Sequence, residues 1–267
     1  MEKSNVPDPK VDLTAYNRAA WDSQAKAKNC WSVPVSAEEI QRARRGDWSI
    51  VLTPHRSVPE DWFPDFAAKP CRVLCLAGSG GQQAPILAAA GANVTVFDLS
   101  EEQLQQDQFV ADRDGLTIDI VQGDMRDLSC FEDEMFDLIV HPCSNSFVPN
   151  ILPVWREAAR VLRVGGEVIS GFTKPVFYVF DQTEIEQGKL VLKHSIPYSE
   201  LTSISESERA SYVSAKEPLC FGHSLGDQMG GQLAAGLRII SYYEDHWDAY
   251  PIGKYIADFG ATRAIKA

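Results

Sequence analysis

Residues 72–98 constrain the fold of this chain more than any other stretch. Val73 to Leu76 is an uninterrupted apolar run, which is typical of a strand buried on both faces. A glycine-rich turn follows it, then an apolar helical segment that stops at Gly91, and then a second β-rich run that ends at Asp98. Strand, turn, helix and strand in this order predict a βαβ unit, and therefore a doubly wound α/β fold with a mostly parallel sheet.

The glycine-rich turn predicts that this unit binds a nucleotide. Gly78, Gly80 and Gly81 permit positive φ and allow a ligand to approach the backbone closely. The amides of such a turn can face an anionic group, and the carboxylate of Asp98 can accept hydrogen bonds from both hydroxyls of a ribose. A dinucleotide fingerprint would need glycine at the third position after Gly80, where this chain has Gln83. That departure disfavours NAD as the ligand.

The same stretch resembles the first motif of class I S-adenosylmethionine-dependent methyltransferases, of the type 11-like group that acts on small molecules. Cys75 stands at the position of the motif's acid, Ala77 at that of its first glycine, and Gly81 matches its last glycine. Further motifs of the family follow in order as far as Phe172. They are Asp98, Gly123 to Met125, residues 136–141 (FDLIVH) and residues 160–166 (RVLRVGG).

The resemblance implies a Rossmann-like sheet with an antiparallel last strand, the cofactor S-adenosyl-L-methionine, and transfer of a methyl group to a small-molecule acceptor by in-line displacement. In the family pattern Asp98 corresponds to the acid that holds the ribose, and Gly123 to Met125 to the corner that holds the adenine. The cofactor-binding residues implied in this way are Ala77, Gly78, Ser79, Gly80, Gly81, Asp98, Leu99, Gly123, Asp124, Met125 and His141.

Residues 141–150 (HPCSNSFVPN) follow the fourth expected strand, at the edge where ligands of open α/β sheets bind. We expect His141, Ser144 and Asn145 to face the methyl donor and its acceptor, with His141 and Asn145 as candidate catalytic residues. His141 is the first candidate for a general base and His55 the second; alternatively, His141 holds its loop by a hydrogen bond. Methylases of nucleic-acid bases usually have an Asp or Asn, two prolines and an aromatic residue here, so this departure favours a small-molecule acceptor.

Four regions are expected along the chain. Residues 1–66 form a tail and a helical arm, residues 67–174 the cofactor-binding core, residues 175–235 a substrate-side insertion with the last helix, and residues 236–267 the closing strands. The arm is rich in aromatic residues. These residues either make the arm a lid that lines the active site or simply pack the arm on the sheet.

Local signals predict several elements within these regions. Residues 14–28 predict a helix, and two pairs predict capping boxes at the starts of later helices: Ser36 with Glu39, and Ser100 with Gln103. In the insertion, the alternation over residues 190–196 predicts a strand, and residues 203–215 predict a short helix.

The charge and the cysteine content of the chain limit the classes of partner and metal site that we expect. Lys and Arg number 25 against 37 Asp and Glu, and the resulting net charge of −12 disfavours nucleic acid. The six cysteines contain no C-x-x-C pair, so we expect neither a zinc framework, another metal site nor a disulfide scaffold. Without an apolar signal region or a stretch of membrane-spanning length, we expect a cytoplasmic protein with no membrane partner, either monomer or homodimer.

Three alternatives to a small-molecule methyltransferase stay open. A non-catalytic sensor or interaction protein that binds S-adenosylmethionine or S-adenosylhomocysteine would share the motifs, and the departures at Cys75 and Ala77 keep it in view. An NAD-dependent oxidoreductase would bind nicotinamide instead. A nucleic-acid methylase would need a basic face, which a chain of this charge must assemble locally.

Overall fold

One sheet in the order β3-β2-β1-β4-β5-β9-β8 forms the centre of the molecule. The structure, a computed structural model, describes residues 12–78 and 80–267. In these residues β9 runs antiparallel to β5 and β8, and the remaining neighbours in the sheet pair in parallel. The prediction of a doubly wound, mostly parallel sheet with an antiparallel last strand is confirmed. The strands are β1 (Arg72–Leu76), β2 (Asn93–Asp98), β3 (Ile118–Gln122), β4 (Phe136–His141), β5 (Leu162–Thr173), β8 (Leu237–Asp245) and β9 (Phe259–Lys266).

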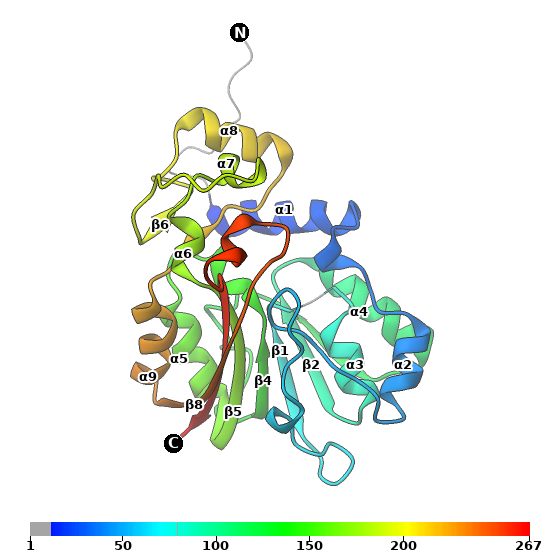
Figure 1. Ribbon diagram of the computed structural model, residues 1–267. Helices are drawn as coiled ribbons and strands as arrows, with labels where there is room; N and C mark the ends of the chain where they lie inside the picture. The colour runs from blue at the N-terminus through cyan, green and yellow to red at the C-terminus, as the bar shows by residue number, and fades with distance from the viewer. Residues whose placement is uncertain (1–11, 79) are drawn as a thin grey trace.

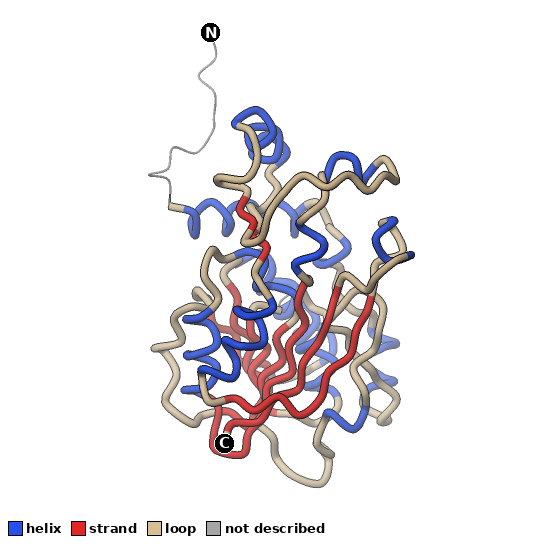
Figure 2. The backbone as a smooth tube through the Cα atoms, turned by 60° about the vertical axis from the view of Figure 1, so that its left-hand side comes forward, coloured by secondary structure: helices blue, strands red, loops and turns tan. Residues whose placement is uncertain are grey.

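Each face of the sheet packs against its own helices. Along β1, Val73 and Cys75 point into one core, and Leu74 and Leu76 into the other. Helices α2, α3 and α4 cover the first face, and α5 and α9 cover the second (Figures 1 and 2). Their bounds are α2 (Ala37–Ala43), α3 (Gln83–Ala89), α4 (Glu101–Asp114), α5 (Leu152–Val161) and α9 (Gly231–Ala234), with a π-helical turn η4 (Gly226–Gly230) before α9.

The predicted helix starts are confirmed with one exception. Helix α1 (Leu13–Lys26) occupies the expected part of the arm, and Ser36 and Glu39 form the complete capping box of α2. Ser100 accepts a hydrogen bond from the backbone of Gln103 at 3.2 Å, but the Gln103 amide donates to Ser32 Oγ at 2.7 Å instead of returning to the cap. The second capping box is therefore wrong in its reciprocal half, because that side chain holds the arm.

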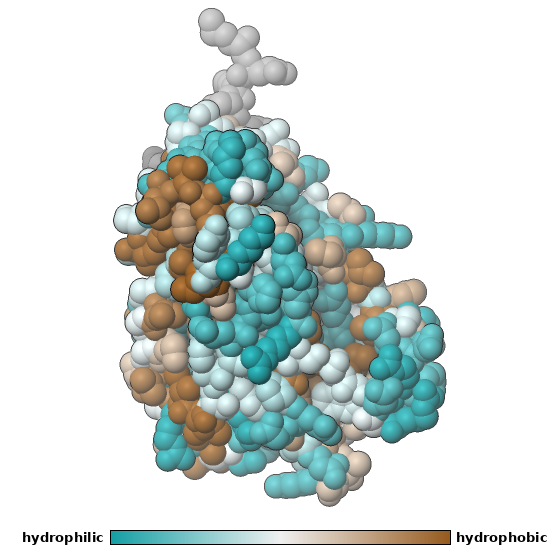
Figure 3. All heavy atoms as spheres, in the orientation of Figure 1, coloured by the Kyte–Doolittle hydropathy of each residue, from teal (hydrophilic) through white to brown (hydrophobic). Residues whose placement is uncertain are grey.

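Residues 175–222 form a cap above the carboxyl ends of the parallel strands, beside α1 (Figure 1). The predicted strand over residues 190–196 is wrong: a single bridge joins Phe180 to Leu192, and Val191 and Leu192 are exposed. The segment has the alternation of a strand but no sheet edge to pair with. Hydrophobic surface gathers over this part of the molecule (Figure 3). The cap elements are α6 (Pro175–Tyr178), α7 (Gln182–Glu186), β6 (Tyr198–Ser199), the predicted helix α8 (Glu206–Ala215) and β7 (Phe221–Gly222).

None of the helices formed by the described residues has the length and apolar character that crossing a membrane requires. Across the same residues, no three His, Cys, Asp or Glu side chains gather as metal ligands would. The amino-terminal tail before residue 12 lies outside the described residues.

Candidate active site

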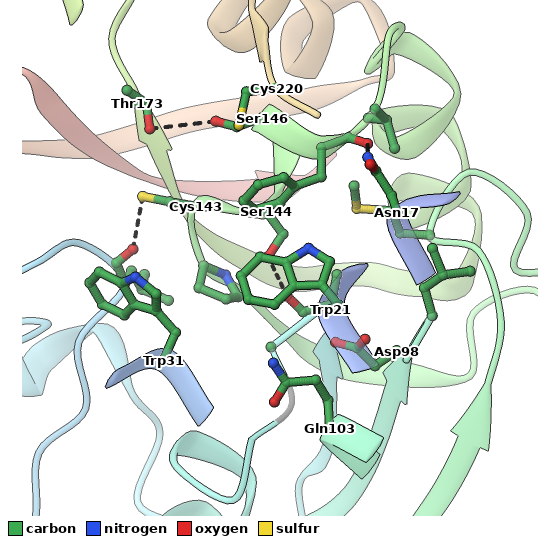
Figure 4. A pocket seen from close by; sticks show the side chains of 18 of the residues that line it. Asn17, Trp21, Trp31, Asp98, Gln103, Cys143, Ser144, Ser146, Thr173 and Cys220 are labelled. Atoms are coloured by element: carbon green, nitrogen blue, oxygen red, sulfur yellow. Dashed lines mark hydrogen bonds between the residues drawn. The ribbon is translucent and has the colours of Figure 1, made fainter. Parts of the chain in front are cut away.

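A cavity of about 340 Å³ opens at the carboxyl ends of the parallel strands, under α1 and the cap. The turns after β1, β2 and β3 form one end of it, which we call the loop end. Ser146, Thr173, Cys220 and several aromatic residues form the other, which we call the cap end. In Figure 4, Asp98 and Gln103 lie on the lower side of the cavity and the three cap-end residues on the upper side.

The turn after β1 reaches the cavity through Ala77 and Gly78. Ala77 has a φ of +49°, a left-handed conformation that costs a residue with a Cβ about 1 kcal/mol. Its carbonyl accepts a hydrogen bond from the hydroxyl of Ser144, which also lines the cavity. A Cβ on Gly78 would lie 2.8 Å from Gln83 Oε1 and 2.9 Å from Pro142 Cδ. No side chain fits there, so bare backbone forms the cavity wall.

The next two glycines of the turn serve the arm rather than the cavity wall. A Cβ on Gly80 would lie 2.7 Å from the carbonyl oxygen of Trp31, and one on Gly81 would lie 2.9 Å from that of Gln106. Both glycines also have positive φ. They allow the arm and α4 to close on the turn. Ser79, predicted to bind cofactor, lies outside the described residues.

A carboxylate from α4 lies under the same turn. The backbone N–H of Gly80 donates to the buried Asp107 Oδ2 at 3.1 Å. Burial raises the pKa of the Cys75 thiol, and the nearby charge of Asp107 raises it further. Cys75 occupies the position of the motif's acid, so the carboxylate that the motif lacks reaches the turn from a neighbouring helix. Sequence reasoning missed Asp107, because no motif position marks it.

Asp98 ends β2 at the loop end of the cavity (Figure 4). Ser100 N donates to Asp98 Oδ1 at 3.0 Å, and Gly123 N donates to the Asp98 carbonyl at 2.9 Å. The first bond orients the Asp98 side chain, and the second joins the end of β2 to the corner at Gly123. Leu99 and Met125 line the same end, whereas Gly123 supports the corner without being part of the wall.

Asp124 lines the loop end with its carboxylate bound to Arg126. Arg126 Nε lies 3.0 and 3.1 Å from the two oxygens, and the Arg126 backbone N–H donates to Oδ1 at 2.9 Å. Burial opposes ionisation, but the hydrogen bonds and charge of Arg126 hold the pKa of Asp124 below its ordinary value. Arg126 Nη2 also donates to Thr14 Oγ1 at 2.7 Å. The loop end therefore keeps an ionised carboxylate that is tied to the arm.

His141 and Asn145 lie beneath the cavity, not in its wall; both are fully buried. His141 Nδ1 is 2.8 Å from the carbonyl oxygen of Leu76, which can only accept, so Nδ1 carries the proton. Burial lowers the pKa of His141 and keeps the ring neutral. Nε2 is then an acceptor 2.9 Å from the Asn145 amide, so that amide must turn its NH₂ group toward it.

His55, the second candidate base, is a surface residue near the cavity mouth. Its side chain is about half exposed and approaches Asp248, and the neighbouring Pro54, not His55, lines the cavity. The structure thus brings the loop-end residues together around one cavity and leaves both histidines out of its wall.

The arm's aromatic residues fall into two sets, one that lines the cavity and one that packs on the sheet. Trp21 of α1 and Trp31 of η1 (Cys30–Ser32) point into the cavity (Figure 4). Trp48, Trp62 and Phe63 instead pack into the core on the first face of the sheet. Sequence composition could not separate the two sets.

Side-chain hydrogen bonds tie the arm to both ends of the cavity. Gln82 Nε2 donates to the carbonyl oxygens of Cys30 at 3.0 Å and Val33 at 3.2 Å, which joins the arm to the glycine turn. The buried Asn17 donates to the Leu219 carbonyl at 3.1 Å and accepts from the Leu219 N–H at 2.9 Å, which joins the arm to the cap. A lone asparagine in an amphipathic helix gave no signal in the sequence.

The sequence of this chain is similar to those of known proteins. Residues 74–170 match the family model described as a methyltransferase domain. The uncharacterized methyltransferase YbaJ of Bacillus subtilis (strain 168) is 49% identical over 254 residues, covering 95% of this chain and 98% of that protein. Over a shorter stretch, the sarcosine/dimethylglycine N-methyltransferase of Halorhodospira halochloris is 34% identical over 102 residues, 38% of this chain and 36% of that enzyme.

The fold has counterparts among solved structures. An S-adenosylmethionine-dependent methyltransferase from Mesorhizobium loti superposes with a TM-score of 0.59 over 77% of this chain and 94% of its own, at 17% identity. At that identity the likeness concerns the fold alone. The near full-length relative and the matched domain carry the assignment beyond it, and they favour a methyl-transfer enzyme over an NAD-dependent oxidoreductase. The chain belongs to the class I S-adenosylmethionine-dependent methyltransferase family, as its ordered motifs predicted.

Proposed function

We propose that this protein transfers a methyl group from S-adenosylmethionine to a small-molecule acceptor. The observation that carries the proposal is that the bare backbone at Gly78 and the carboxylates of Asp98 and Asp124 surround one cavity at the carboxyl edge of the sheet. These groups fit the cofactor. Asp98 would accept the ribose hydroxyls, Gly78 would let the chain approach closely, and Asp124 with Leu99 and Met125 would hold the adenine.

The cofactor supplies a methyl group on a sulfonium sulfur, which keeps the electron pair of the broken C–S bond. A lone pair of the acceptor forms the new bond, and a protonated acceptor releases its proton to water. The protein's part is to hold the acceptor in near-attack geometry. Among the described residues of the cavity wall there is neither histidine nor lysine, and the ionisable carboxylates lie at the loop end. We therefore assign positioning, not proton removal, to the cap end.

His141 and Asn145 are proposed as positioning residues. They connect the end of β4 to the Leu76 carbonyl on one side and to the buried Gln228 on the other, where Asn145 is 2.9 Å from the Gln228 amide. The serines that flank Asn145, Ser144 and Ser146, line the cavity. A buried, satisfied network of this kind fixes the direction of the loop that carries them.

A small acceptor is supported by the cover over the cavity and by charge. The arm and the cap both contribute to the wall, and the net charge of −12 disfavours a polyanionic substrate. The relative that acts on sarcosine and dimethylglycine is itself an enzyme for small molecules. Whether the protein is a monomer or a homodimer stays a prediction, which light scattering on the purified protein would test.

Calorimetric titration with S-adenosylmethionine, S-adenosylhomocysteine and NAD, on protein stripped of ligand, tests the cofactor site. We expect both sulfur nucleosides to bind and NAD to give no heat. Asp98→Ala should weaken nucleoside binding by about 1.5–3 kcal/mol, or roughly 10–150-fold, because charged hydrogen bonds to the ribose are lost. Asp119→Ala, an exposed carboxylate on the adjacent strand β3, is the matched control. Unchanged affinity in Asp98→Ala would refute the assignment of that residue.

Methyl transfer separates the enzyme from the sensor alternative. Protein that binds the nucleosides is incubated with labelled S-adenosylmethionine and a panel of small acceptors. Labelled product is expected with at least one acceptor. Nucleoside binding without transfer to any acceptor would favour the sensor.

A further inference from the structure

We propose that the acceptor is an uncharged, flat aromatic molecule, held at the cap end by aromatic side chains, with its hydroxyl, thiol or amine group directed toward a cluster of neutral hydroxyls. This inference deepens the proposed function and rests on it. Three features of the cap end carry it: the arrangement of its rings, its lack of charge, and the position of its hydroxyl groups.

Four aromatic side chains at the cap end form a closed circuit, which we call the aromatic wall. Ring centroids are 5.7 Å apart for Phe177 and Tyr250, 5.6 Å for Tyr250 and Trp247, 6.2 Å for Trp247 and Phe259, and 6.5 Å for Phe259 and Phe177. All four line the cavity. Trp31 of the arm extends the wall, with its centroid 5.2 Å from that of Trp247. Such a surface favours a flat, apolar partner by burial and by ring contacts.

The cap end disfavours an anionic acceptor. The charged side chains in the described cavity wall are Asp98, Asp124 and Arg126, all at the loop end. At the cap end, burial raises the pKa of Cys143, and the charges of Asp245 and Asp258 behind the wall raise it further. A carboxylate placed there would lose its hydration, find no cation among the described wall residues and meet a negative field. Amino acids are therefore poor acceptors for this site.

A cationic acceptor is disfavoured by the methyl donor, which is itself a sulfonium cation. A second positive charge close to it in a cavity of low dielectric is repelled. An uncharged ring avoids this penalty.

Three neutral hydroxyl groups complete the cap end; we call Ser146, Thr173 and Tyr178 the hydroxyl cluster. Ser146 Oγ donates to Thr173 Oγ1 at 3.5 Å (Figure 4). Burial raises the pKa of Tyr178 well above its usual range, while hydrogen bonds to Ser146 and Thr173 oppose the rise. The phenol therefore stays protonated at neutral pH. Hydroxyls can both donate and accept, so the cluster can orient a neutral OH, SH or NH group without needing charge.

Calorimetry with three probes of similar ring character tests this inference. The protein, saturated with S-adenosylhomocysteine, is titrated with 2-naphthol, with 2-naphthoate and with phenyltrimethylammonium. We expect 2-naphthol to bind at least about tenfold more tightly than either charged probe, a difference of about 1.4 kcal/mol. Equal or tighter binding of naphthoate, or of the ammonium, would overturn the inference.

Variants of the aromatic wall test whether 2-naphthol binds at this wall. Trp247→Ala, and Phe177→Leu, which keeps apolar volume without a ring, should each weaken 2-naphthol binding by about three- to tenfold. Tyr255→Ala removes an aromatic side chain that is 80% exposed outside the cavity wall and should leave it unchanged. Naphthol binding that survives both wall variants would contradict the proposal.

S-Adenosylhomocysteine titrated into ligand-free wild-type protein and ligand-free variants separates failure of the proposed function from failure of the acceptor class. If it fails to bind wild-type protein, the proposed function falls. If it binds all variants within about twofold while 2-naphthol shows no preference over naphthoate, only the assignment of the acceptor class falls.

Discussion

The two ends of the cavity are built in opposite ways. The loop end takes its wall from turns after three parallel strands, between Ala77 and Arg126, with its polarity in carboxylates and bare backbone. The cap end draws on segments far apart in the sequence, from Trp31 to Phe259, with its polarity in neutral hydroxyls. A charged, motif-bearing half therefore faces an aromatic, uncharged half across about 340 Å³.

This contrast concerns how firmly each end of the cavity is held by the rest of the fold. The loop end is held by the parallel sheet itself, because each turn begins where a parallel strand ends. The cap end rests on a cover whose elements are short and whose outer apolar residues are exposed. If the halves are energetically separate, a change that disturbs one should leave ligand binding at the other intact.

The largest expected effect is on the stability of the cap side as pH rises. Glu200 is 7% exposed, and burial raises its pKa to about 7, against a hydrogen bond from Cys220 N at 2.7 Å. With a raised folded-state pKa, the stabilisation is complete below the ordinary carboxyl value near 4.5 and is lost as pH rises through 7. We expect the free energy of unfolding to fall by about 3 kcal/mol from this group between pH 4.5 and 8.

Urea denaturation across that pH range measures the loss, and Glu200→Gln should remove most of it. Glu206→Gln, an exposed glutamate at the start of α8, serves as the control. Affinity for S-adenosylhomocysteine should stay level over the same range, since the pKa of Asp124 is held below its ordinary value. Parallel pH profiles for wild type and Glu200→Gln would show that this carboxyl is not the source.

An intermediate effect is expected where α4 supports the glycine turn. Asp107→Ala leaves the buried N–H of Gly80 without its acceptor and should lower stability by about 1–3 kcal/mol and weaken cofactor binding. Cys75→Asp restores the motif's acid. In the Asp107→Ala background it should recover binding, whereas alone it places two carboxylates together and should destabilise the protein.

The decisive result is whether Cys75→Asp changes from destabilising in the wild-type background to restoring in the Asp107→Ala background. Thermal unfolding measures its effect on stability, and calorimetry with S-adenosylhomocysteine measures its effect on binding. If Cys75→Asp is equally harmful in both backgrounds, the idea that Asp107 replaces the motif's acid is wrong.

The smallest expected effect is a gain in stability when Ala77 is replaced by glycine. Ala77→Gly removes a Cβ from a residue with a φ of +49° and should stabilise the protein by about 0.5–1 kcal/mol. Ala88→Gly is the matched control, because that alanine lies within α3 and its replacement should destabilise the protein by a similar amount. Differential scanning calorimetry compares the unfolding temperatures of the two variants. If both variants shift that temperature in the same direction, backbone strain at Ala77 is absent.

Prediction from sequence succeeded where the signal was local. The sheet, the helix starts and the position of Asp98 followed from apolar runs, caps and glycine stops that lie within a few residues of the features they mark. The strand over residues 190–196 was wrong because alternation does not say whether a partner strand is present. Asn17 and Asp107 could not be found, since their partners Leu219 and Gly80 become neighbours only in the folded chain.

Asn17 couples the two covers of the cavity mechanically. Its one amide side chain bridges α1 to the backbone at Phe147 and Leu219, so the arm and the cap separate only by breaking buried hydrogen bonds, each costing on the order of 1 kcal/mol. Because the arm is also fastened to the glycine turn through Gln82, that separation disturbs the floor of the site as well. We therefore expect a change at Asn17 to loosen the arm, the cap and the glycine turn together.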